Sequence, residues 1–131
     1  MIGLDTNVLV RYIVADDVAQ SAAAVKIFES LSPESPGFVP LVVAAELTWV
    51  AQFSYEFNKQ EIATVIEKLL QSSELLLERS DIVDQALRQF RARRSDFADC
   101  LIERCAHAAG CRHSVTFDKR AADLAGMRLI L

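Results

Sequence analysis

Hydrophobic positions along the chain fall into two patterns. Very short apolar runs bounded by polar or turn residues predict buried strands. Between them, apolar side chains recur every three or four positions, as at Val18, Ala22, Val25 and Phe28, which predicts helices. The predicted strands cover residues 2–4, 38–40, 75–77, 113–117 and 127–131.

The predicted helices begin after polar side chains that cap them and end at turn residues. Gly110 stops the helix before it, and a loop over residues 32–37 is rich in proline and glycine. The expected caps are Asp16 and Asp17, Ser80 or Asp81, and Ser95. The expected helices cover residues 8–15, 18–28, 41–55, 59–71, 81–94, 96–109 and 119–125.

Strands that alternate with one or two helices predict the α/β class. We expect a three-layer sandwich, with a central, mostly parallel sheet of four to five short strands flanked by helices and joined by right-handed crossovers. The 131 residues fit a single domain, residues 1–131. The helix over 41–55 is hydrophobic nearly all round, so we expect it to be largely buried.

Composition indicates which class of protein and which cell compartment to expect. Hydrophobic residues make up 52% of the chain and charged residues 24%, which is typical of soluble globular proteins. The longest apolar run, 41–45, is too short to span a bilayer, and Asp5 and Arg11 interrupt any signal sequence. Three cysteines without metal-site spacing predict reduced, mostly buried thiols and a cytoplasmic location. A net charge of −4 is only weak evidence against a nucleic-acid partner.

Two aspartates hold equivalent places in the pattern. Asp5 directly follows the first predicted strand, and Asp118 directly follows the fourth. Ligands of parallel sheets bind beyond the carboxyl ends of the strands. If these two strands are neighbours, ~5 Å apart, their carboxylates can share one ion. Taken alone, Asp5 also fits a simple helix cap.

Three further acids stand in unusual surroundings. Asp96 and Asp99 are three residues apart in the first turn of a helix, so they point to the same side. Glu46 lies in the middle of an apolar helix, where burial is costly unless a partner or a ligand compensates it. The alternative for Glu46 is a narrow exposed stripe shared with Gln52.

Converging carboxylates repel one another unless a cation offsets their charge. Ligation by oxygen atoms alone selects Mg²⁺ or Mn²⁺ over zinc. Such ions commonly act on phosphate esters, where they activate water and stabilise the leaving oxygen. The acids therefore favour a metal-dependent phosphodiesterase.

These motifs resemble the PIN domain, and within it the VapC-type ribonuclease toxins of bacterial toxin–antitoxin pairs. The resemblance covers the whole chain. It implies RNA hydrolysis that depends on Mg²⁺ or Mn²⁺, a homodimer, and inhibition by a cognate antitoxin protein. The residues that carry it are Asp5-Thr6-Asn7 after the first strand, Glu46, Asp96-Phe97-Ala98-Asp99, and Thr116-Phe117-Asp118.

The resemblance also implies roles for these residues. Asp5, Glu46, Asp99 and Asp118 match the acidic quartet of the family, and Asp96 matches an additional acid found in a subset. Asp5, Asp99 and Asp118, with Asp96, would hold the metal, and Glu46 would complete a second site or orient the attacking water. The supporting residues are Thr6 and Asn7, which would orient the first aspartate, and Thr116, which would bond near the metal.

Basic and aromatic residues have two interpretations each. The basic side chains either hold the RNA backbone or form solvated helix ends; they are Arg11, Arg91, Arg93, Arg94 and Lys119. The aromatic residues Trp49, Phe53, Tyr55 and Phe57 fit a core or a dimer interface better than a platform for stacking bases. Tyr12 and the apolar face of the first two helices fit either ordinary core or a groove for the antitoxin.

Two other functions remain open. One is a phosphatase with Asp5 as its nucleophile, but enzymes of that kind need a second acid two residues later, where this chain has Asn7. The other is a catalytically silent PIN fold or receiver-like module that only binds partners.

Overall fold

The chain folds into short parallel strands and longer helices, seen here in a computed structural model that describes residues 1–93 and 95–131. Every predicted strand and helix is confirmed. The strands are β1 (Ile2–Gly3), β2 (Gly37–Val39), β3 (Leu75–Leu77), β4 (Val115–Thr116) and β5 (Arg128–Leu129). The helices are α1 (Thr6–Ile13), α2 (Val18–Glu29), α3 (Leu41–Ser54), α4 (Lys59–Gln71), α5 (Ser80–Ala92), α6 (Phe97–Ala108) and α7 (Lys119–Leu124).

The strands form two parallel sheets. In the first, β1, β2 and β3 follow one another, with Ile2 opposite Gly37 and Gly37 opposite Leu75. In the second, β4 pairs with β5. The α/β class and the parallel pairing are confirmed, while β1 and β4, whose pairing the sequence analysis considered only as a condition, lie in different sheets. β4 pairs instead with β5, to which α7 joins it directly.

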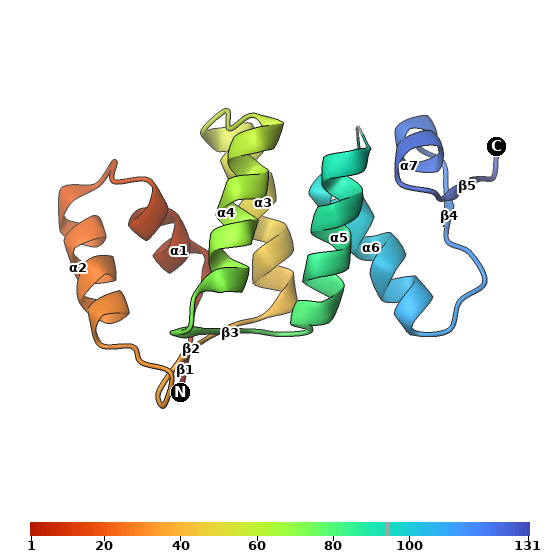
Figure 1. Cartoon of the computed structure of the whole chain (residues 1–131). Coiled ribbons are helices and arrows are strands. Elements are labelled where there is room, and N and C mark those ends of the chain that lie inside the picture. Colours follow the sequence, from red (N-terminus) through yellow and green to blue (C-terminus); the bar gives the residue numbers. More distant parts are fainter. Residues whose placement is uncertain (94) are drawn as a thin grey trace.

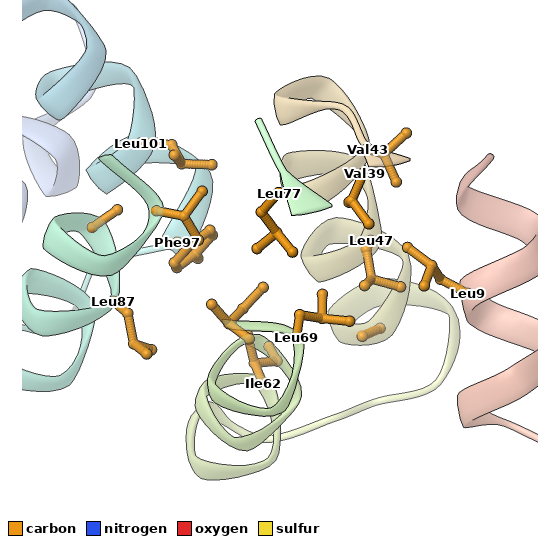
Figure 2. Packing of buried hydrophobic residues seen from close by; sticks show 14 of the residues in the cluster. Leu9, Val39, Val43, Leu47, Ile62, Leu69, Leu77, Leu87, Phe97 and Leu101 are labelled. Carbon is orange, nitrogen blue, oxygen red and sulfur yellow. The ribbon is translucent and has the colours of Figure 1, made fainter. Parts of the chain in front are cut away.

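The main core lies where α3, α4, α5 and α6 meet above the first sheet (Figures 1 and 2). Figure 2 shows Leu47 of α3 with Leu69 of α4 on one side and Leu9 of α1 on the other, and Phe97 of α6 at the opposite side of the core from Leu9. Leu9, Leu47 and Phe97 are almost fully buried. Truncating a side chain such as Leu47 to alanine costs about 2–5 kcal/mol in a core of this kind.

Local sequence explains several element boundaries. Gly37 has no side chain because a Cβ there would lie 2.7 Å from Leu4 Cδ1. Asn58 begins α4 with a capping box, in which its side chain accepts from the Glu61 N–H while the Glu61 carboxylate accepts from the Asn58 N–H. Gly110 ends the α6 segment with φ +94°, as predicted.

Some predicted caps are wrong by one residue. Asp17 caps α2 as expected, through the Gln20 N–H. For α5, the residue before the helix is Arg79, in a left-handed conformation, and neither Ser80 nor Asp81 is the cap. For α6, Asp96 takes the cap position, while the Ser95 hydroxyl lies 3.1 Å from Cys100 Sγ. Two adjacent residues that both favour caps cannot be separated by propensity alone.

One face of α3 is exposed, so the expectation that this helix is largely buried is only half right. Leu47 and Ala51 are buried, whereas Val42, Trp49 and Phe53 are 72%, 58% and 56% exposed. On α2 the apolar side chains that the sequence predicted to face the core are also mainly exposed to solvent, and the buried positions are Ser21 and Ala24.

The cysteines are free, as predicted, but only Cys100 is buried; Cys105 is half-buried and Cys111 is exposed.

In the described part of the chain, none of the helices has the length and apolar character needed to cross a membrane.

Residues 115–129 form what we call the C-terminal unit: β4, α7 and β5. It has a small apolar cluster of its own, made by Ala121, Ala125 and Met127. A Cβ on Gly126 would lie 2.9 Å from Arg93 Nη1, so the unit rests against the end of α5. Figure 1 shows it at the opposite end of the molecule from β1.

Candidate functional site

Asp5, Thr6 and Glu46 come together where β1 runs into α1. Asp5 is the N-cap of α1, and its Oδ1 accepts from the Thr6 N–H at 2.8 Å. The Thr6 side chain is buried, and its hydroxyl donates to Glu46 Oε1. Glu46 stands on the exposed face of α3. Thr6 therefore positions two carboxylates at once, Asp5 through its backbone and Glu46 through its hydroxyl.

A second group of acids surrounds the start of α6. Asp96 and Asp99 are half-buried there, and Asp118 is exposed at the start of α7. Burial raises the pKa of the Asp99 carboxyl, and the negative charges of Asp96 and Asp118 raise it further, while Arg120 opposes them. The predicted grouping of these three acids is thus visible in their electrostatics.

The structure does not unite the two groups. Among residues 1–93 and 95–131, no cluster of three or more carboxylate, histidine or cysteine side chains is arranged to hold a metal ion. The acids themselves offer only oxygen donors, which suit Mg²⁺ or Mn²⁺.

The other two predicted supporting residues, Thr116 and Asn7, differ in their contacts and exposure. The Thr116 hydroxyl accepts from the Asp118 N–H at 3.0 Å, so Thr116 orders the loop that carries this acid. The Asp118 carboxylate in turn accepts from the Arg120 N–H and caps α7. Asn7 is exposed on the first turn of α1.

Most of the predicted RNA-binding cations already contact protein groups. Arg11 donates to Asp16, Gln20 and Tyr55. Arg91 pairs with Glu67 at 2.9 Å, and Arg93 lies against Gly126. Lys119 is exposed beside Asp118. Arg94 lies outside the described residues.

An aromatic pair lies one turn from Glu46, and because it is exposed, the interpretation of these two residues as core is wrong. Trp49 and Phe53 have ring centroids 4.7 Å apart and are both more than half exposed. They share the exposed face of α3 with Val42 and Glu46. The spacing of these four positions, at 42, 46, 49 and 53, is that of one helix face, so the acid could have been used to mark the exposed side. Tyr55 and Phe57, by contrast, pack against the core.

An apolar groove of about 600 Å³ lies between α1, α2 and α4, and none of the five predicted site acids is among its lining residues. Tyr12 and Phe28 stack in it with centroids 3.9 Å apart, and Val25 and Val65 extend the apolar lining. Glu29, Lys68 and Glu74 supply its charged groups. The two helices that the sequence marked as a possible groove therefore do form one.

Comparisons with known proteins give a family model and a similar protein. Residues 2–127 match the sequence model of the PIN domain. A protein named VapC ribonuclease, from Aquifex aeolicus (strain VF5), is 27% identical to this chain over 118 residues, which are 89% of this chain and 87% of that protein.

Proposed function

The chain belongs to the PIN domain family, and from that premise we propose that it is an endoribonuclease, dependent on Mg²⁺ or Mn²⁺, that serves as the toxin of a toxin–antitoxin pair. The observation that carries the proposal is the arrangement of Asp5, Thr6 and Glu46 at the carboxyl end of β1. Thr6 holds Asp5 through its backbone N–H and Glu46 through its buried hydroxyl, which fixes two carboxylates in place as a metal site requires of its ligands. The name of the similar Aquifex protein supports RNA as the substrate.

In this proposal Asp5, Asp99 and Asp118 are the principal metal ligands, with Asp96 beside them. Glu46 completes a second site or orients the attacking water. A divalent ion would supply charge neutralisation and activation of water.

The proposal also includes the location and the partners of the protein. A reduced set of cysteines and an RNA substrate suit a cytoplasmic enzyme. We assign the antitoxin to the groove between α1, α2 and α4, because its stacked Tyr12 and Phe28 offer an apolar anchor site with charged groups at the rim. Replacing Val25 by aspartate should abolish neutralisation by the antitoxin and leave RNA cleavage unchanged.

The central experiment is an RNA-cleavage assay with the purified chain. We expect cleavage with Mg²⁺ or Mn²⁺, its loss on chelation, and its recovery when the metal is restored. The Asp5→Asn variant should lose activity by at least about 100-fold, since a ligand charge is removed. Cleavage that survives both chelation and Asp5→Asn would refute the proposal.

A further inference from the structure

The charges of this chain are unevenly distributed. Residues 112–131, which we call the basic segment, carry four cations and two carboxylates, a net charge of +2, whereas the whole chain carries −4. The basic segment includes the C-terminal unit, which stands at one end of the molecule (Figure 1). A positive end on an acidic protein is a surface that attracts a polyanion.

Three cations of the basic segment are available to such a ligand. Among the residues that the structure describes, no carboxylate forms an ion pair with Arg112, Lys119 or Arg128, and all three are exposed. Five arginines in the rest of the chain do pair with carboxylates; they are Arg11, Arg79, Arg88, Arg91 and Arg104. A phosphate can therefore reach the three cations without displacing a protein partner.

The fold of the C-terminal unit gathers these cations around β4. Arg128 is opposite Val115 in the β4–β5 ladder, so the two side chains project from the same face of the sheet. Arg112 lines a small pocket of about 90 Å³ together with Ser114 and Gly126, which places it where the two strands begin. Lys119 begins α7, three residues after Thr116 of β4.

An exposed aromatic ring lies among these cations. Phe117 directly follows β4 and is 71% exposed, and Val115 beside it is 54% exposed. Bases of single-stranded RNA stack on rings of this kind, whereas the bases of a duplex are already stacked on one another. Cations interspersed with an exposed ring therefore favour a single strand as the ligand.

We propose that the basic segment holds single-stranded RNA, with phosphates bound by Arg112, Lys119 and Arg128 and one base stacked on Phe117. The inference rests on the proposed ribonuclease function and names the form of RNA that it takes. Phe117 and Lys119 flank Asp118 in the sequence, so a strand held by both passes this candidate metal ligand. Phosphate contacts supply affinity and register, and the ring selects unpaired bases.

The role of the ring can be tested by binding alone. Wild-type protein in the presence of a chelator is titrated into a fluorescent RNA of about 12 nucleotides, single-stranded or annealed to its complement, and anisotropy is measured. We expect the single strand to bind at least about 5-fold more tightly, the fold-change that corresponds to the weakest stacking of one base. Phe117→Leu should remove this advantage, and Phe117→Tyr, which keeps a ring, should retain it. The control Trp49→Leu removes an exposed ring from α3 and should bind like wild type.

The role of the cations can be tested by salt dependence. Each phosphate contact with a single strand contributes about −0.7 to the slope of log affinity against log salt concentration. Lys119→Gln and Arg128→Gln should each make that slope less steep by about 0.7. Lys26→Gln makes the same change of charge at an exposed position of α2 and should leave the slope unchanged.

Several results would overturn the inference. They are a wild-type chain that binds no RNA, equal affinity for single strand and duplex, and a Phe117→Leu variant that binds the single strand like wild type. An equal effect of Lys119→Gln and Lys26→Gln would show that net charge alone is responsible. Arg128→Gln keeps the test decisive if another variant fails to fold.

The two proposals fail in different ways. Selective binding of the single strand with no cleavage after Mg²⁺ or Mn²⁺ is restored would refute the ribonuclease function alone. Metal-dependent cleavage by wild type, with unchanged RNA affinity in the Phe117→Leu and Lys119→Gln variants, would refute the role of the basic segment alone.

Discussion

At the scale of single residues, the Thr6 hydroxyl has the most specific task. It is buried, and it donates to Glu46 from the position directly after Asp5. We predict that Thr6→Val lowers the rate of RNA cleavage by about 10-fold, the equivalent of one hydrogen bond to a charged group. Thr6→Ser keeps the hydroxyl and should restore most of the rate. Equal rates for Thr6→Val and wild type, measured on one RNA, would contradict this role.

The network of Asp16, Tyr55 and Arg11 should make stability depend on pH. The hydroxyl of Tyr55, at 2.9 Å, lowers the pKa of the Asp16 carboxyl, and Arg11 adds to the effect. Because the folded pKa lies below the unfolded value of about 3.9, the stabilisation is full above that pH and disappears as the pH falls through the folded pKa.

We therefore predict that Asp16→Asn lowers the midpoint of thermal unfolding at pH 7 and loses this effect near pH 2–3. Parallel melts of wild type and variant at both pH values measure it. Glu34→Gln, in the exposed loop before β2, serves as a charge-matched control. A difference between wild type and Asp16→Asn that persists at low pH would show that lost packing, and not charge, is responsible.

At the scale of elements, the start of α4 depends on a reciprocal cap. Replacing Asn58 by alanine removes the acceptor for the Glu61 N–H and should lower the free energy of unfolding by about 1 kcal/mol. Asn58→Asp keeps an acceptor and should stay within about 0.5 kcal/mol of wild type. Urea denaturation followed by circular dichroism distinguishes the two. A similar loss in both variants would mean that the cap contributes little.

The sequence was sufficient to predict the elements, because their apolar spacing and turn residues are strong local signals. For the exposed side of α3 the sequence offers one signal, Glu46, because that helix is apolar on nearly every other side, and the expectation of a largely buried helix passed over it. The sequence could not predict the partner of β4. Strands of two residues carry too little pattern to specify a neighbour, so the pairing depends on tertiary contacts.

In the candidate site, too, features within one segment could be predicted from the sequence, whereas distances between segments could not. Local motifs correctly grouped Asp96 with Asp99, which lie in one helix turn, and placed Asp5 at the end of β1. The distance between these groups depends on how α6 and the C-terminal unit pack, which no local motif contains. Thr6 was expected to orient Asp5, and the structure adds that its hydroxyl also holds Glu46.

At the scale of the whole molecule, stability and activity should be separable by truncation. Among the residues that the structure describes, the main core extends no further along the chain than Cys105, while the C-terminal unit has its own cluster. We predict that a chain ending at residue 112 stays folded, with a loss of less than about 2 kcal/mol, yet cleaves no RNA because Asp118 is gone. Melting and cleavage of the truncated and full chains test this. Failure of the truncated chain to fold would show that the unit supports the core.

The hydrogen bond from the Thr6 N–H to Asp5 Oδ1 has a practical consequence. Asparagine carries an oxygen in the same place and caps helices about as well as aspartate. Asp5→Asn should therefore silence the enzyme while α1 stays capped, whereas Asp5→Ala would damage both. An intact but silent chain is what is needed to trap uncut RNA from cells, and through it the natural target of this protein becomes accessible to sequencing.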